Sequence, residues 1–90
     1  MVLLIDIGNS NIVLGAHDGR QFAFTARLAT AAERTMDEWA GALSCVFGLH
    51  GLSGADIEGA MISSVVPPMV RPMREAIEML CARRALIVGP

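Results

Sequence analysis

The chain has 90 residues, which is enough for one small domain or for part of a larger one. Hydrophobic residues make up 53% of it and charged residues 18%, whereas a typical globular domain has about 25% charged residues. A small domain needs more polar surface than a large one, so we expect a piece of a longer protein whose apolar face is covered from outside. The formal net charge is −2, and the seven basic residues are scattered arginines, which argues against nucleic acid as a partner.

The amino terminus and the cysteines indicate the compartment. No basic n-region precedes the first apolar run, and Asp6 breaks that run, so neither a signal peptide nor a membrane span is expected. Cys45 and Cys81 lie on apolar stripes of expected helices, which favours buried free thiols over a disulfide. No His or third Cys has the spacing of a zinc ligand. We therefore expect a soluble cytoplasmic protein with no membrane partner.

The first expected strand, residues 2–7, contains the most informative residue of the chain. Every position except Asp6 is aliphatic, as in a central strand that is buried on both faces. A carboxylate inside a sheet is unfavourable unless it is paired, hydrogen-bonded or opposite a cation, so Asp6 indicates a site. Gly8 permits a tight turn, and three short polar residues after it could hold phosphate oxygens: Asn9, Ser10 and Asn11. The alternative is an ordinary hairpin turn that Asp6 caps.

Two more strands and a helix follow. Residues 11–16 and 21–28 are expected strands separated by an Asp18-Gly19 turn, which gives three consecutive antiparallel strands. Thr35 and Glu38 have the spacing of a capping box, and His50-Gly51 supplies a stop, so a helix is expected between them. Its apolar stripe comprises Met36, Trp39, Ala40, Leu43, Val46 and Phe47, which makes Trp39 a core residue rather than a ligand stacker. His50 is interpreted as a capping residue.

The second half alternates strands and helices. Residues 59–66 form a nearly apolar strand, again expected to be buried on both faces and reached by a parallel crossover. Ser63 and Ser64 at its end either bond neighbouring backbone or belong to a site, and both interpretations stay open. A helix is expected over residues 69–84, with an inner stripe of Val70, Met73, Ile77, Leu80 and Cys81. Residues 85–88 form the last strand, and Gly89-Pro90 follows where a ligand loop could begin.

The order of these elements, βββαβαβ, predicts an α/β fold with a mixed sheet and a central first strand. It matches the half-domain of actin-like, sugar-kinase-like ATPases, which have a sheet of the RNase-H-like type and hold nucleotide phosphates at the first hairpin. Four segments resemble, in the same order, the amino-terminal part of type III pantothenate kinases: Asp6-Ile7-Gly8-Asn9-Ser10-Asn11, Arg34-Thr35-Met36-Asp37-Glu38, Ile62-Ser63-Ser64-Val65-Val66-Pro67 and Val88-Gly89-Pro90. Residues 1–90 are thus expected to be the incomplete amino-terminal part of an actin-like ATPase domain.

The resemblance implies ATP-dependent phosphorylation of pantothenate to 4′-phosphopantothenate, the first step toward coenzyme A, by a homodimer. The implied cofactors are ATP, Mg²⁺ and a monovalent cation, K⁺ or NH₄⁺. Asp6 would help to bind Mg²⁺, and the nucleotide would be held by Asp6, Ile7, Gly8, Asn9, Ser10 and Asn11. The family usually has Thr where this chain has Ser10, which keeps the hydroxyl.

The resemblance also places the catalytic aspartate, the monovalent-cation site and most of the pantothenate pocket beyond Pro90. We therefore expect the ninety residues alone to bind nucleotide weakly at most and to have no turnover. Two alternatives stay open: another actin-like ATPase or sugar kinase, and a non-catalytic regulatory or structural module of the same fold. An RNase-H-like nuclease is disfavoured because Asp56 and Glu58 lie in a loop rather than in a second strand.

Overall fold

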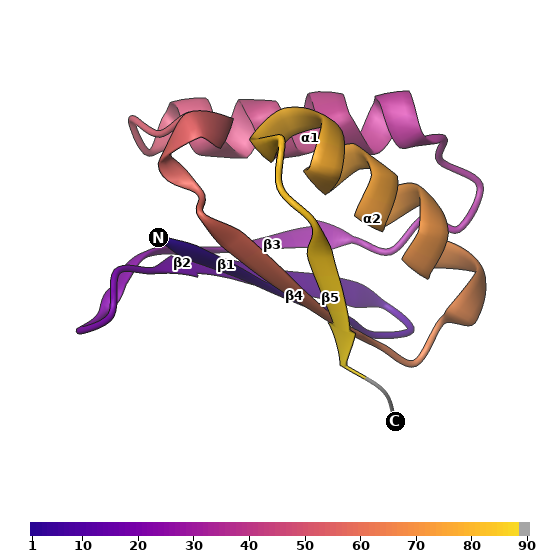
Figure 1. Cartoon of the computed structure of the whole chain (residues 1–90). Coiled ribbons are helices and arrows are strands. Elements are labelled where there is room, and N and C mark those ends of the chain that lie inside the picture. The colour runs from indigo at the N-terminus through magenta and orange to yellow at the C-terminus, as the bar shows by residue number, and fades with distance from the viewer. Residues whose placement is uncertain (89–90) are drawn as a thin grey trace.

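A computed structural model describes residues 1–88, and Gly89-Pro90, where a ligand loop could begin, lies outside the described residues. The strands are β1 (Val2–Ile7), β2 (Asn11–His17), β3 (Phe22–Ala29), β4 (Gly59–Ser64) and β5 (Ala85–Val88). The helices are α1 (Met36–Leu49) and α2 (Pro67–Cys81), and a short 3₁₀ helix spans Gly54–Asp56. The expected order, βββαβαβ, is confirmed (Figure 1).

The strands form one mixed sheet in the order β3-β2-β1-β4-β5, with β1 in the centre as expected. The β1–β2 and β2–β3 pairs are antiparallel, and the β1–β4 and β4–β5 pairs are parallel. The β3–α1–β4 and β4–α2–β5 connections therefore join parallel strands and advance across the sheet in the same direction. Because such crossovers are right-handed, both helices lie on one face of the sheet (Figure 1).

The hydrophobic core lies between the two helices and this face. Alternate residues of β1 and β2 point into it, as the period of two along a strand requires. The largest fully buried side chains are Leu3, Ile7, Ile12, Leu14, Trp39, Leu43, Phe47, Ile57, Ile62, Met69, Met73 and Ile77. Trp39 thus belongs to the core, as its place on the α1 stripe predicts.

The opposite face of the sheet carries no helix, and we call it the open face (Figure 1). Its side chains form cross-strand rows: one row is Val13, Asp6, Ser63 and Val88, and the next is Gly15, Leu4, Met61 and Leu86. Several of them are apolar yet solvent-exposed, including Leu86 at 66% and Val88 at 43%. The expectation that residues 2–7 and 59–66 are buried on both faces is wrong for this chain, because nothing in residues 1–88 covers the open face. The presence of an exposed apolar face agrees with the expectation drawn from the high share of hydrophobic residues.

The ends of α1 form as the sequence predicts. The Glu38 N–H donates to the Thr35 hydroxyl at 3.3 Å, and the Thr35 N–H donates to the Glu38 carboxylate at 3.0 Å, which completes the capping box. His50 is the C-cap, and Gly51 follows it with a φ of 70°. The His50 ring also stacks on Phe24 with the ring centroids 4.5 Å apart.

Helix α2 begins and ends earlier than expected. Pro67 and Pro68 lie in its first turn, where an N–H is not needed, and Ala82 ends it with a left-handed φ of 53°. Its buried residues are Met69, Met73, Ala76, Ile77 and Cys81, whereas Val70 and Leu80 of the expected stripe are half-buried.

The two cysteines differ. Both thiols are free, but Cys45 is exposed, because it lies about 200° around α1 from the buried Leu43. The expectation of burial holds for Cys81 alone, and burial raises the pKa of that thiol. Within residues 1–88, neither helix is long and apolar enough to cross a membrane.

Candidate phosphate-binding site

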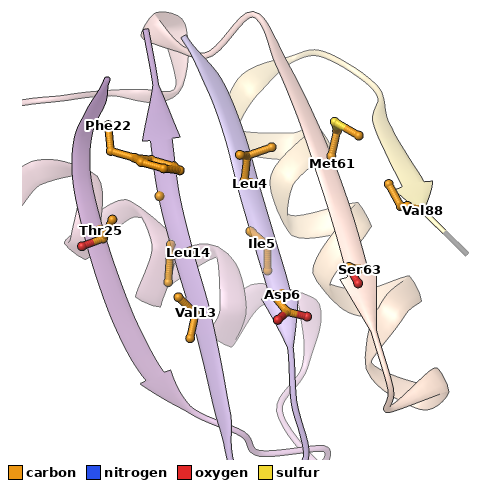
Figure 2. Close-up of a pocket in the computed structure, with 11 residues that line it drawn as sticks. Leu4, Ile5, Asp6, Val13, Leu14, Phe22, Thr25, Met61, Ser63 and Val88 are labelled. Atoms are coloured by element: carbon orange, nitrogen blue, oxygen red, sulfur yellow. The ribbon is translucent and has the colours of Figure 1, made fainter. Parts of the chain in front are cut away.

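Asp6 lies near the carboxyl end of the central strand β1, with its side chain on the open face. The carboxylate is exposed, and no ion pair or hydrogen bond within residues 1–88 involves it. Water therefore solvates Asp6 in this chain, and the cost of a carboxylate inside a sheet, from which we first inferred a site, does not arise here. Its register partner on the parallel strand β4 is Ser63, and the two residues lie side by side in Figure 2.

A hollow of about 310 Å³ runs along the open face, with Asp6 and Ser63 near one end of it (Figure 2). Its lining residues are mostly apolar and come from all five strands: Leu4, Ile5, Asp6, Val13, Leu14, Gly15, Phe22, Thr25, Met61, Ser63 and Val88. An apolar surface of this kind can bind hydrocarbon groups, but it offers no hydrogen bonds or positive charge to stabilise an anion. A phosphate would therefore bind beyond the strand end, at the loop that follows β1, and not in the hollow.

That loop, residues 8–10, joins β1 to β2 in a tight turn. The Gly8 N–H donates to the Asn11 carbonyl at 2.9 Å, and a Cβ on Gly8 would lie 3.0 Å from the same oxygen. The tight turn expected at Gly8 is therefore present. Asn9, Ser10 and Asn11 are exposed, and the N–H groups of Asn9 and Ser10 donate to no acceptor within residues 1–88. The loop thus offers two unpartnered backbone donors together with short polar side chains.

Ile7 links the end of β1 to the segment after β4, and Ser64 bonds its own neighbours in that segment. The side chain of Ile7 is fully buried on the helix side, so Ile7 could reach a nucleotide only through its backbone. Its carbonyl accepts the Val65 N–H at 3.0 Å. The Ser64 hydroxyl accepts the Val66 N–H at 2.9 Å and donates to the Val66 carbonyl at 3.1 Å. Of the two interpretations left open for the serines, local backbone bonding therefore describes Ser64, whereas Ser63 lies on the open face beside Asp6.

Sequence reasoning missed Thr30, which lies between the expected strand over residues 21–28 and the expected helix. Its hydroxyl donates to the Gly8 carbonyl at 2.8 Å, and its N–H donates to the Ser10 carbonyl at 3.0 Å. The signal that could have found it is the β2–β3 pairing. Asn11 pairs with Ala29, so the residue after Ala29 must lie against the β1–β2 turn.

The residues present fit Mg²⁺ only when it arrives with phosphate. Within the described residues, no group of three or more His, Cys, Asp or Glu side chains could hold a metal ion. Mg²⁺ usually takes one or two protein carboxylates, several waters and substrate phosphates. A solvated carboxylate without a protein partner, next to unpartnered donors at a strand end, matches that requirement.

The comparisons with known proteins identify the family. The model of a family described as type III pantothenate kinase matches residues 2–90. This chain belongs to the type III pantothenate kinase family. A relative of that name from Exiguobacterium sibiricum is 41% identical over 90 residues, which are all of this chain and 36% of the relative. Another, from Brevibacillus brevis, is 42% identical over 94 residues and is covered to 35%. The chain thus spans about a third of the length of the curated relatives it matches.

Solved structures confirm the fold class of this kinase-family chain. It superposes on a ROK hexokinase from Thermus thermophilus with a TM-score of 0.67 at 18% identity, covering 98% of this chain and 34% of the hexokinase. A putative N-acetylglucosamine kinase from Porphyromonas gingivalis gives a TM-score of 0.71 at 16% identity, with 99% and 34% covered. Identities this low show a shared fold alone. The mixed sheet is therefore of the sugar-kinase and actin-like ATPase type, as expected.

Proposed function

We propose that the natural protein carrying this chain transfers a phosphoryl group from ATP to pantothenate, and that residues 6–11 bind the ATP phosphates. Membership of the type III pantothenate kinase family supports the reaction. The observation that supports the site is the solvated Asp6 carboxylate at the end of the central strand, next to a loop with unpartnered N–H groups. In open α/β sheets, ligands bind beyond the carboxyl ends of the strands, and Asp6 and Ser63 lie near two such ends.

The roles follow from the chemistry of phosphoryl transfer, which needs positioning and charge neutralisation more than covalent help from the protein. The N–H groups of Asn9 and Ser10, the Ser10 hydroxyl and the Asn9 amide donate to phosphate oxygens. Asp6 would repel those oxygens if it acted alone, so it holds Mg²⁺ together with the phosphates. When bound, Mg²⁺ neutralises the negative charge that Asp6 and the phosphates share.

The rest of the reaction needs residues that this chain does not supply. Asp6, once engaged with the metal, cannot also serve as the base for the pantothenate hydroxyl. In this proposal a separate catalytic aspartate, the site for K⁺ or NH₄⁺ and most of the pantothenate pocket belong to the rest of the protein, since this chain covers only 36% of the Exiguobacterium sibiricum relative. The active protein is a cytoplasmic homodimer. The ninety residues by themselves bind nucleotide weakly at most and do not turn over.

A sugar kinase is the other candidate, since the two solved structures named above are sugar kinases by title. At identities of 18% and 16%, these two structures are evidence for a shared fold but not for a shared substrate. The relatives at 41% and 42% identity are named type III pantothenate kinase, which favours pantothenate over a sugar. No observation in residues 1–88 favours a non-catalytic module.

Substitution of Asp6 in the natural protein tests the proposal. Asp6→Asn keeps the size of the side chain but removes its charge. The control, Asp56→Asn, makes the same change at the opposite end of β1, where the Asp56 carbonyl accepts from the terminal amine of Met1. We expect Asp6→Asn to weaken Mg·ATP binding about 10- to 100-fold, the value of a hydrogen bond or contact to a charged group, and to lower kcat. Asp56→Asn should bind as the wild type does. Calorimetry with Mg·ATP and a coupled kinase assay measure both, and unchanged affinity and rate in Asp6→Asn would remove Asp6 from the site.

A further inference from the structure

Thr30 is the first residue after β3, and it makes two hydrogen bonds to the loop between β1 and β2. Its hydroxyl donates to the carbonyl of Gly8 at 2.8 Å, and its N–H donates to the carbonyl of Ser10 at 3.0 Å. We propose that Thr30 is a positioning residue, which holds this loop so that its N–H groups face the phosphates of the nucleotide. The inference rests on the function proposed above, because it takes residues 8–10 as the phosphate-binding loop.

The planarity of the peptide bond explains how Thr30 acts through the loop. In a trans peptide, the C=O of one residue and the N–H of the next point in opposite directions. When the Gly8 carbonyl points to the Thr30 hydroxyl, the Asn9 N–H must therefore point away from Thr30. The Ser10 carbonyl fixes the Asn11 N–H in the same way. Thr30 thus binds two carbonyls that would otherwise repel a phosphate, and it turns outward the Asn9 N–H, one of the two donors proposed to bind phosphate.

The hydroxyl of Thr30 also replaces a bond that such a turn normally makes. In a four-residue turn over Gly8–Asn11, the N–H of the last residue commonly donates to the carbonyl of the first. Residues 1–88 contain the reverse bond, from the Gly8 N–H to the Asn11 carbonyl, but the Gly8 carbonyl accepts from Thr30 instead. A donor supplied from 22 residues away therefore sets the orientation of the turn.

Threonine suits this position for two reasons. Its branched Cβ restricts χ1, so the hydroxyl is held in place with little loss of side-chain entropy. Thr30 is half-buried, which limits the competition of water for the Gly8 carbonyl. The pairing of Asn11 with Ala29 places the next residue directly against the turn.

Three variants of the natural protein test the role of Thr30. Thr30→Val keeps the shape and the backbone N–H but removes the hydroxyl, and Thr30→Ser restores a hydroxyl. Thr35→Val is the matched control: it removes the cap of α1 and so destabilises the fold, without any contact to the loop. The readouts are amide exchange at Gly8, the dissociation constant for Mg·ATP and the separate KM values for ATP and pantothenate.

We expect Thr30→Val to speed exchange of the Gly8 N–H by about 3- to 10-fold and to weaken Mg·ATP binding by a similar factor, the value of one hydrogen bond. The KM for ATP should rise while the KM for pantothenate stays unchanged. Thr30→Ser should lie within about twofold of the wild type, because its hydroxyl can make the same bond. Thr35→Val should bind Mg·ATP as the wild type does, despite its lower stability.

Two results would overturn the inference. One is a Thr30→Val protein that binds Mg·ATP like Thr35→Val, and the other is a Thr30→Ser protein as defective as Thr30→Val. The proposed function fails separately, if the wild type does not bind Mg·ATP at all. Accelerated Gly8 exchange in Thr30→Val would then show that Thr30 braces the turn for structural reasons, which also overturns a role in nucleotide binding.

Discussion

Substituting Gly8 by alanine tests whether the tight loop after β1 needs glycine. A Cβ at this position would lie 3.0 Å from the Asn11 carbonyl oxygen, whereas ordinary contacts begin at 3.4 Å. Moving the two residues apart by about 0.4 Å would stretch their hydrogen bond from 2.9 Å to about 3.3 Å, past the usual range for N–H···O bonds. The loss of that bond costs about 0.5–1.5 kcal/mol.

The matched control is Gly41→Ala, in the exposed part of α1. A Cβ there meets no atom within 4 Å, so the substitution should only reduce the entropy of the unfolded chain and improve helix propensity. It should stabilise by about 0.5–1 kcal/mol. For a domain of this size, 1 kcal/mol moves the melting temperature by about 4–8 °C. Gly8→Ala should thus melt about 2–12 °C below the wild type and Gly41→Ala about 2–8 °C above it.

Thermal unfolding of the ninety-residue chain at low concentration, followed by circular dichroism, measures both variants. In the natural protein, calorimetry with Mg·ATP should show weaker binding for Gly8→Ala and unchanged binding for Gly41→Ala. If Gly8→Ala were as stable as Gly41→Ala, the contact between Gly8 and Asn11 would not limit the loop, and the reasoning from its geometry would be refuted.

Two further predictions concern the open face and the cap of α1. The ninety-residue chain should self-associate through its open face, so its mass by light scattering should rise with concentration. Leu86→Lys, on the edge strand β5, should suppress this self-association, whereas Leu49→Lys on α1 should not. Equal effects of the two substitutions would contradict association through the open face. The Thr35 N–H holds the pKa of Glu38 below its ordinary value of 4.5, so the cap stabilises the fold above that pH and loses its effect as the pH falls below it. Urea unfolding of Glu38→Gln should show a smaller loss of stability between pH 7 and acid than the wild type, with Glu33→Gln as the control; identical pH profiles for Glu38→Gln and the wild type would exclude the cap as the cause.

The features that sequence predicted well have their signals in a few adjacent residues or in the order of the elements. The capping box of Thr35 and Glu38 lies within one helical turn, and the stop at Gly51 depends on its own φ. The central position of β1 followed from the order of the elements and the short connections. These inferences need no knowledge of what lies across the sheet.

Two of the three errors have a different origin, since they depend on distant parts of the chain. An aliphatic run such as residues 59–64 shows that both faces of a strand can be buried, but not whether residues 1–88 cover both. The expectation placed Cys45 on an apolar stripe, but the buried stripe of α1 lies on the other side of the helix from Cys45. Thr30 escaped notice because its role comes from the β2–β3 register and not from its neighbours in sequence.

The exposure of Asp6 changes the argument for a cation without removing it. On this face, its neighbours in the row are Val13 and Ser63, and the next row contains Leu4 and Met61, so an aliphatic residue at position 6 would fit the sheet at least as well. The acid makes no ion pair within residues 1–88, and the sheet gains no stability from its charge. Any cover over the open face would remove water from the carboxylate and raise the need for a partner charge. We therefore propose that a bound ligand explains Asp6, and that a divalent cation carried by phosphate would supply the partner charge that no other side chain of residues 1–88 supplies.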